Sequence, residues 1–379
     1  MASPLKVLTI AGTRPEAIKL FPLIHALSAD DRFVSRVCAS GQHRTVLDEV
    51  FDLADVALDH DLGVMTPGQS LDRLTGAVLD GVGRVLDAER PDWVVVQGDT
   101  ATAMASALAA YHRRIPVAHV EAGLRSGNLR HPWPEEGNRR AIAGLASLHC
   151  APTRTAAAAL KGEGISPATV HVTGNTGIDA LHWVLNQAAE RPELTADIDS
   201  LADRFAGRRI IGVTAHRREN LGQGLRGIAD AVRRIAERDD VAVVCPVHPN
   251  PAVHEILHDR LGGMANIALT QPLAYPQFAR LMSKASLLLT DSGGVQEEAP
   301  ALGTPVLVMR ETTERPEAVA AGTARLVGTD PDRIVAEAER LLDDESAYQA
   351  MARAHNPFGD GRASGRIAEL LAQEPQSVG

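Results

Sequence analysis

The sequence predicts an α/β protein built from two Rossmann-like domains, each with a parallel sheet covered by helices on both faces. Short β-rich runs alternate with amphipathic or alanine-rich helical stretches along the whole chain, which is typical of parallel sheets. The chain has 379 residues and is too long for one compact core of ordinary size. Since the same alternation fills both halves, we expect two sheets of similar design.

The predicted strands divide evenly between the two halves. The first half has strands near 5–11, 34–39, 93–97, 116–120, 148–151 and 170–173, and the second has strands near 209–214, 241–247, 267–269, 286–290, 305–308 and 324–327. A polar, helical stretch at 175–207 is the expected connection. We therefore place the N-terminal domain at 1–174 and the C-terminal domain at 175–361. The strong breaker at 356–361 precedes a last helix, 362–379, which we expect to pack back onto the first domain.

Composition excludes several classes of protein. The hydrophobic and charged fractions, 45% and 23%, are those of a globular protein, and the net charge of −10 disfavours nucleic-acid binding. No run approaches the length of a membrane span, and the N-terminus lacks the features of a signal peptide, so we expect a cytoplasmic protein. The three cysteines lie far apart without a CxxC motif and are expected to be buried small hydrophobes rather than metal ligands or disulfides.

A glycine turn is the most informative local feature. Ser292, Gly293 and Gly294 follow an apolar strand and open a predicted helix, an arrangement in which backbone N–H groups approach a phosphate closely. Glu298 lies further along this helix, where its carboxylate can accept hydrogen bonds from a ribose diol. The pattern predicts a nucleotide diphosphate site, and the alternative is a turn that uses the glycines only for packing.

Reactive residues also follow the strands of the first half, at the sheet edge where ligands of such folds collect. Arg14 and Lys19 flank a helix N-terminus, where a compensating anion is expected because cations oppose the helix dipole. Solvation, or pairing of Arg14 with Glu16, is the alternative. Asp99 and Glu121 end neighbouring strands and should meet at one edge. Asp99 could instead cap the next helix, whereas Glu121 has no such structural explanation.

Glu135 lies with Glu136 in the first turn of a predicted helix. Either carboxylate could have only the structural role of stabilising the helix dipole. In the second half, His216 ends a strand beside two arginines, which favours phosphate contact. His216 and His248 together could suggest a metal, but no HxH or HExxH spacing occurs, so we expect none.

Taken together, these motifs resemble the non-hydrolysing UDP-N-acetylglucosamine 2-epimerase family over nearly the whole chain. The phrases that carry the resemblance are Gly12-Thr13-Arg14-Pro15-Glu16, Gln42-His43-Arg44, Gln97-Gly98-Asp99-Thr100, His119-Val120-Glu121-Ala122-Gly123-Leu124-Arg125, Pro132-Trp133-Pro134-Glu135-Glu136, His216-Arg217-Arg218-Glu219, Asp291-Ser292-Gly293-Gly294 and Thr313-Glu314-Arg315-Pro316-Glu317.

The resemblance implies a GT-B-like pair of domains with the active site in the cleft between them, a UDP-sugar substrate, no cofactor and, usually, a homodimer. It implies that UDP leaves the sugar as the C2 proton is removed, giving a 2-acetamidoglucal, and that UDP adds back after a proton returns to the opposite face of C2. The implied catalytic residues are Asp99, Glu121, Glu135 and His216. The implied substrate-binding residues are Arg14, Lys19, Phe278 at the uracil end, Ser292, Gly293, Gly294, Glu298 and Arg315.

Gln42, His43 and Arg44 are candidates for a regulatory site, which in bacterial members binds a second, activating substrate molecule. The chain departs from the family pattern here, with Thr45 after this phrase and with two basic groups in 127–131. If the regulatory site is lost, the rate should depend hyperbolically on substrate concentration.

Three other functions compete with this interpretation. A GT-B glycosyltransferase would require an acceptor and only one catalytic base. A hydrolysing epimerase would release ManNAc and UDP. A sensor without activity would bind the nucleotide sugar without turnover, which the retained carboxylates disfavour.

Overall fold

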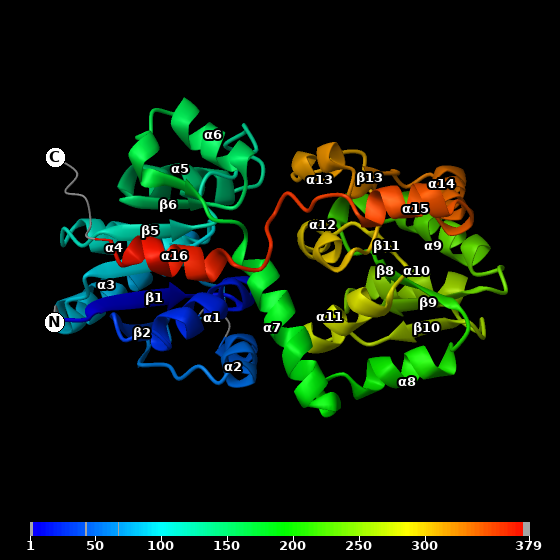
Figure 1. The fold of residues 1–379 in the computed structure, drawn as a ribbon, viewed down its shortest axis with the longest axis horizontal. Coiled ribbons are helices and arrows are strands. Elements are labelled where there is room, and N and C mark those ends of the chain that lie inside the picture. The colour runs from blue at the N-terminus through cyan, green and yellow to red at the C-terminus, as the bar shows by residue number, and fades with distance from the viewer. Residues whose placement is uncertain (1–2, 42–43, 67, 374–379) are drawn as a thin grey trace. The chain divides into compact units, whose positions relative to one another are not determined.

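The computed structural model describes residues 3–41, 44–66 and 68–373, and the chain forms two compact units (Figure 1). The first unit comprises Met1–Ala180 and Phe358–Gly379, and the second comprises Leu181–Pro357. The boundaries expected from the sequence, after 174 and after 361, stay predictions. Within the described ranges, no helix combines the length and the hydropathy needed to cross a bilayer.

The first unit contains a seven-stranded sheet in the order β3-β2-β1-β4-β5-β6-β7, with every neighbouring pair parallel. Its strands are β1 (Leu5–Ala11), β2 (Phe33–Ala39), β3 (His60–Asp61), β4 (Trp93–Gln97), β5 (Val117–Val120), β6 (Leu148–Ala151) and β7 (Val170–Val172). The edge strand β3 was not predicted, because two polar residues carry no pattern of burial.

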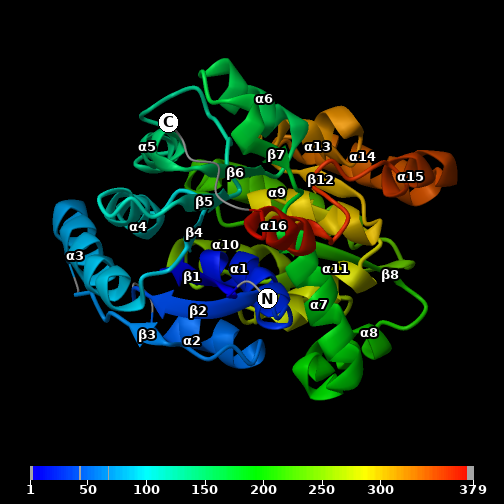
Figure 2. The same ribbon diagram turned by 60° about the vertical axis from the view of Figure 1, so that its left-hand side comes forward.

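The helices that begin in the first unit are α1 (Arg14–Ser28), α2 (Arg44–Leu53), α3 (Leu71–Glu89), α4 (Ala101–Tyr111), α5 (Glu135–Leu145), α6 (Arg154–Gly162), η1 (Pro167–Thr169), α7 (Thr176–Glu190), which runs into the second unit, and α16 (Ala363–Leu371). Helices α3, α4 and α5 pack in succession and share a core with the central strands (Figure 2). The alanine-rich sequence of α4 suits this central place, because small side chains let the neighbouring helices approach closely.

The last helix, α16, packs against α1. Asp179 anchors its N-terminus by accepting hydrogen bonds from the backbone N–H groups of Ala363 (3.2 Å) and Ser364 (2.8 Å). Just before α16, the backbone N–H of Asn175 donates to the carbonyl of Phe358 at 2.7 Å. The end of the described chain is therefore a structural part of the first unit.

The second unit has a six-stranded, all-parallel sheet in the order β10-β9-β8-β11-β12-β13. Its strands are β8 (Arg209–Thr214), β9 (Val241–Pro246), β10 (Ile267–Thr270), β11 (Leu287–Thr290), β12 (Val306–Val308) and β13 (Ala324–Leu326). Its helices are η2 (Pro192–Leu194), α8 (Ala196–Arg204), η3 (Arg218–Asn220), α9 (Gln223–Ile235), α10 (Pro251–Leu261), α11 (Tyr275–Lys284), α12 (Gly293–Glu298), η4 (Ala299–Leu302), α13 (Pro316–Ala321), α14 (Pro331–Asp343) and α15 (Glu345–Ala352).

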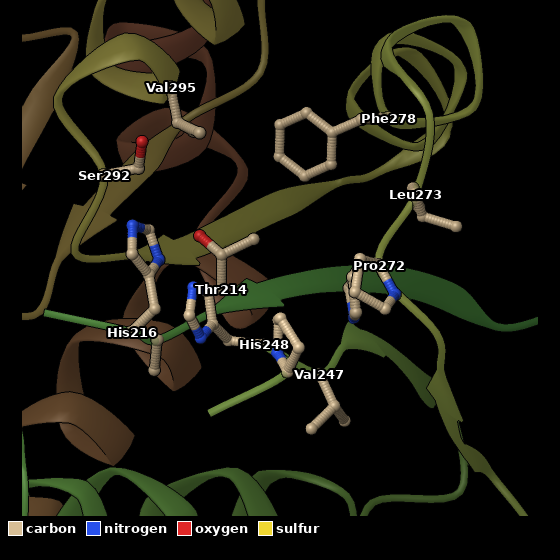
Figure 3. Close-up of a pocket in the computed structure, with 12 residues that line it drawn as sticks. Thr214, His216, Val247, His248, Pro272, Leu273, Phe278, Ser292 and Val295 are labelled. Atoms are coloured by element: carbon tan, nitrogen blue, oxygen red, sulfur yellow. The ribbon is translucent and has the colours of Figure 1, made fainter. Parts of the chain in front are cut away.

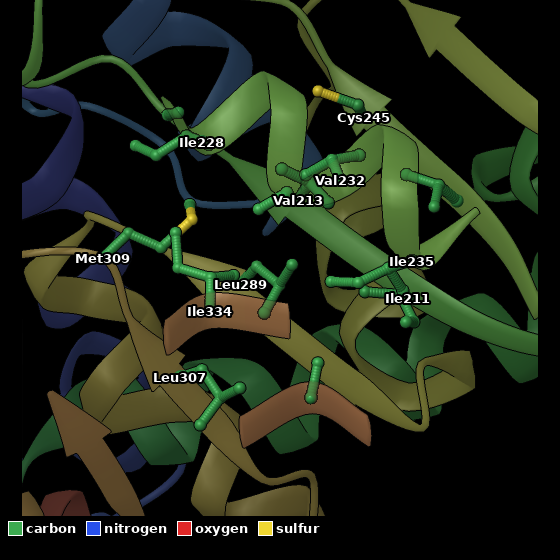
Figure 4. Close-up of a cluster of buried hydrophobic side chains, with 14 of the residues drawn as sticks. Ile211, Val213, Ile228, Val232, Ile235, Cys245, Leu289, Leu307, Met309 and Ile334 are labelled. Atoms are coloured by element: carbon green, nitrogen blue, oxygen red, sulfur yellow. The ribbon is translucent and has the colours of Figure 1, made fainter. Parts of the chain in front are cut away.

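Alternate residues of this second sheet enter two different cores. Ile211 and Val213 of β8 pack with helices α9, α10 and α14 (Figure 4). Ile210 packs with α8 and α11 on the opposite face. Both faces are therefore apolar, which explains why the strands are continuous hydrophobic runs. Cys245 belongs to the first of these cores, and Cys38 and Cys150 lie in strands of the first unit. All three are free and buried, and burial raises the pKa of each thiol to about 12.

Candidate functional site

The strand order reverses direction at one place in each sheet, between β1 and β4 in the first unit and between β8 and β11 in the second. In open parallel sheets a crevice forms at this reversal, outside the carboxyl ends of the strands, and ligands bind there. The residues predicted to carry the chemistry follow these strands and their neighbours. We describe the two units separately.

In the first unit, Glu121 follows β5 and is ion-paired with Lys19 of α1. Gln97, the last residue of β4, donates a hydrogen bond from Nε2 to Glu121 Oε2 at 3.1 Å. The backbone of Glu121 has a φ of +64°, which is uncommon for a residue with a side chain, and such conformations cluster at active sites. Two residues predicted separately, Lys19 and Glu121, are thus in direct contact.

Asp99 is held by α5, the helix that Glu135 begins. Arg139 contacts Asp99 Oδ2 through Nη2 at 2.6 Å, and Asn138 donates to the Asp99 carbonyl at 2.8 Å. The residue that caps α4 is Thr100, whose Oγ1 accepts from the backbone N–H of Ala103. The structural alternative for Asp99, that of an N-cap, is therefore wrong.

Glu135 and Glu136 have different surroundings although they are adjacent. Glu136 is fully buried and accepts hydrogen bonds from Ser126, Arg139 and Arg140; burial raises its pKa, these bonds lower it, and the pKa lies below its ordinary value. Glu135 Oε2 is also inaccessible to solvent but has no hydrogen-bond partner among the described residues. A carboxylate oxygen in that position is costly unless a ligand or a proton reaches it.

Glu16 belongs to this site and was missed as a site residue. Its buried carboxylate accepts hydrogen bonds from the Gly12 N–H (3.1 Å) and the hydroxyls of Thr13 (2.7 Å) and Thr100 (2.8 Å), so it ties the end of β1 to the end of β4. Burial raises its pKa to about 7, against the lowering effect of these bonds. The spacing from Thr13 to Glu16 is that of a capping box, a signal that could have identified this residue.

The cations at the start of α1 were also predicted. Arg14 is the first residue of α1 and is half-buried. Among the described residues, the Glu16 carboxylate receives its hydrogen bonds from Gly12, Thr13 and Thr100, and pairing with Arg14 is absent. The alternative in which Glu16 neutralises Arg14 is therefore wrong. Lys19, one turn further, is the cation that meets Glu121.

In the second unit, a pocket of about 230 Å³ lies at the reversal between β8 and β11 (Figure 3). The predicted residues His216, Phe278 and Ser292 all line it. Its other lining residues are Thr214, Ala215, Pro246, Val247, His248, Pro249, Pro272, Leu273 and Val295. The rings of His216 and His248 are stacked, with centroids 5.5 Å apart and planes inclined by 11°. One end of the pocket is thus polar, while Phe278 and Leu273 make the other end apolar.

The side chain of Arg315 packs against the glycine turn. Arg315 Nε donates to Glu297 Oε1 at 2.7 Å, and a Cβ added to Gly293 would lie 3.1 Å from the Arg315 guanidinium carbon. A Cβ on Gly294 would meet no atom within 4 Å. A Cβ at Gly293 would therefore crowd the Arg315 guanidinium, while Gly294 leaves the backbone open to a ligand. Glu298 is the last residue of α12.

Three residues were predicted to form a regulatory site. Gln42 and His43 lie outside the described residues, and Arg44 is the first residue of α2. The regulatory site stays a prediction. Within the described ranges, no cluster of three or more His, Cys, Asp or Glu side chains is placed to hold a metal ion.

Comparison with known proteins gives consistent results. A family model described as UDP-N-acetylglucosamine 2-epimerase matches residues 25–372. A protein of that name from Escherichia coli K12 is 51% identical over 372 residues, which cover 97% of this chain and 98% of the relative. A crystal structure of a UDP-GlcNAc 2-epimerase from Neisseria meningitidis bound to UDP-GlcNAc has a TM-score of 0.86 and 44% identity, and covers 97% of this chain and 99% of that one. A further structure, of a protein from Listeria monocytogenes described as a UDP-N-acetylglucosamine 2-epimerase, has a TM-score of 0.89 and 42% identity, with 98% and 99% covered.

Proposed function

We propose that this chain, which belongs to the UDP-N-acetylglucosamine 2-epimerase family, interconverts UDP-GlcNAc and UDP-ManNAc without hydrolysis. Membership makes it an isomerase-type enzyme. The proposal concerns the route, which is loss of UDP to give a 2-acetamidoglucal, followed by re-addition of UDP with inversion at C2.

The observation that carries the proposal is a set of carboxylates, of which two follow β4 and β5 and one begins α5. A proton on C2 is not acidic while C1 keeps an ordinary C–O bond, so UDP must leave before or during its removal. Inversion then needs a base on one face of C2 and an acid on the other, which requires at least two groups. Asp99, Glu121 and Glu135 supply three, and Glu135 Oε2 has no hydrogen-bond partner among the described residues.

The second unit supplies the groups that suit the departing diphosphate. His216 and Ser292 line the polar end of the pocket, and the open backbone at Gly294 presents no Cβ. We assign the uracil end to Phe278 and the ribose hydroxyls to Glu298. Arg14, Lys19 and Arg315 are the cations that we assign to stabilising negative charge as the C1–O bond breaks. Since the N. meningitidis relative was crystallised with UDP-GlcNAc bound, a nucleotide-sugar substrate is a reasonable assignment.

The proposal requires that both sets of residues act on the same substrate molecule, which stays a prediction. The homodimer and the cytoplasmic location also stay predictions.

Incubation of the purified protein with UDP-GlcNAc alone in D2O tests the proposal. We expect UDP-ManNAc to form without an acceptor, and both sugar nucleotides to gain deuterium at C2. An absolute requirement for an acceptor would instead indicate a glycosyltransferase. Irreversible release of free ManNAc and UDP would indicate a hydrolysing enzyme, and binding without turnover would indicate a sensor.

A further inference from the structure

The second unit contains a buried carboxylate that the proposed reaction does not use. Asp291 follows β11 and has no solvent exposure. Its Oδ2 accepts hydrogen bonds from the backbone N–H groups of His216 (2.9 Å) and Arg217 (2.8 Å) and from Asn220 Nδ2 (3.1 Å). The other oxygen, Oδ1, has no hydrogen-bond partner among the described residues and lies 3.3 Å from His216 Nδ1. Asp291 therefore presents a buried negative charge to the His216 ring from behind the pocket.

The protonation of His216 is set by opposing influences. Burial is the largest and disfavours the imidazolium, as do Arg217 on the same loop and His248, whose ring stacks on that of His216. Asp291 favours it. Without a ligand the net effect holds the pKa of His216 below its ordinary value, so the ring is neutral at neutral pH and above.

A bound diphosphate adds negative charge on the other side of this ring. The His216 side chain retains 37% of its exposure and lines the pocket beside Ser292. An anion there places His216 between two negative groups, the ligand and Asp291. Opposite charges within about 4–6 Å favour the charged form of a titratable group, and both now act in the same direction.

We propose that binding of a nucleoside diphosphate is coupled to the uptake of one proton by His216, with Asp291 as the positioning residue that holds the Nδ1 proton. The inference rests on the proposed function, because it takes the diphosphate to occupy this pocket. The proton comes from the solvent and completes an imidazolium. Nδ1–H points to Asp291 Oδ1, and Nε2–H is donated to a diphosphate oxygen. When the nucleotide leaves, the same proton returns to the solvent, so the epimerisation consumes none.

Protonation of His216 would stabilise the diphosphate as a leaving group. A neutral ring with its proton on Nδ1, the position that Asp291 favours, would present a lone pair rather than a donor to the diphosphate. The imidazolium presents a charged donor to the oxygens on which negative charge grows as the C1–O bond breaks. Asp291 acts through His216 and does not itself touch the ligand.

Isothermal titration of the full-length protein with UDP tests the proposal. The titrations are made at about pH 8, well above the phosphate pKa of about 6, in two buffers with different ionisation enthalpies. We expect about one proton to be taken up per UDP bound, seen as a difference in apparent binding enthalpy between buffers. Binding with no proton uptake would overturn this inference while leaving the nucleotide site intact. Failure of UDP to bind would instead count against the proposed function.

Variants identify the group that takes up the proton. His216→Asn should bind UDP roughly ten- to a hundredfold more weakly, as expected for loss of a hydrogen bond from a charged donor, and should take up no proton. Asp291→Asn should retain binding but take up clearly less than one proton. His248→Phe, which keeps a stacked ring, and the surface control His254→Asn should both take up about one proton. Uptake that persists in His216→Asn would overturn the assignment, and its disappearance in His248→Phe would assign the proton to His248.

Discussion

The two units share the same type of parallel sheet, but different kinds of polar residue follow their strands. Each sheet reverses its strand order after its first strand, at β1/β4 and at β8/β11, and each places a buried carboxylate there. In the first unit this is Glu16, which hydroxyls and one N–H group surround. In the second it is Asp291, which lies against an imidazole and two backbone N–H groups. Further acids follow the strands in the first unit, whereas histidines and a glycine turn follow them in the second.

This difference shows that the sheet fixes where a site forms but not what it does. Most residues within the central strands are buried and apolar. Residues just beyond the carboxyl ends leave the core, so their side chains are free to specialise. On this account, changes in the first unit should affect proton transfer, and changes in the second should affect nucleotide binding.

The largest expected effect is on kcat, and it separates proton transfer from nucleotide binding. Asp99→Asn, Glu121→Gln and Glu135→Gln should each lower kcat by about two to four orders of magnitude, because each would remove a proposed general acid or base. Their affinity for UDP should change little. Steady-state kinetics and UDP titration measure both quantities, and Asp80→Asn, on the exposed surface of α3, is a matched control. If these variants lost UDP affinity as strongly as kcat, the division of labour would be wrong.

The second prediction tests the buried carboxylate of the first unit. Because the folded protein holds the Glu16 pKa at about 7, above its ordinary value of 4.5, Glu16 binds a proton more tightly when folded than when unfolded. Its contribution is therefore fully present below about pH 4.5 and is lost as pH rises through about 7. The stability lost over this range is on the order of 3 kcal/mol.

Urea unfolding of the wild type and Glu16→Gln across this pH range measures that contribution. The amide does not titrate, so the difference in unfolding free energy between the two proteins should change between pH 4.5 and 7 and be constant above about pH 8. A difference that does not vary with pH would mean that Glu16 is ionised throughout.

A third prediction concerns the turn that follows β5 and contains Glu121. Gly123 has a φ of +92°, and an added Cβ would lie 2.3 Å from the carbonyl oxygen of Ala156. Gly127 also has a positive φ, of +74°, but a Cβ there would meet no atom within 4 Å. Gly123→Ala should therefore destabilise the protein by about 2 kcal/mol more than Gly127→Ala. Equal losses in chemical denaturation would show that backbone strain alone matters at both positions.

The smallest predicted effect lies at the apolar end of the pocket in the second unit. Phe278→Ala should weaken UDP binding about tenfold, because stacking of a base on an aromatic ring contributes about 1–3 kcal/mol. Affinity for inorganic pyrophosphate should stay unchanged, which provides an internal control. An equal loss for both ligands would place Phe278 away from the base.

Much of the fold could be predicted because the physical signals are local. All six strands predicted in each half exist within a residue or so, since strands buried on both faces are continuous apolar runs. The strand β3 could not be found, because its two polar residues form an edge only through pairing with β2. Likewise Glu121 was identified because a carboxylate that ends an apolar strand needs an explanation.

The amino-acid sequence by itself determined the fold class, the positions of the strands and most of the polar residues at their ends. Only the tertiary structure decided how those residues pair. It showed that Thr100 rather than Asp99 caps α4, that Lys19 reaches Glu121, and that Asp291 lies behind His216. These pairs are separated by up to 102 positions in the chain, and contacts over such separations depend on strand order and burial, which no local pattern encodes.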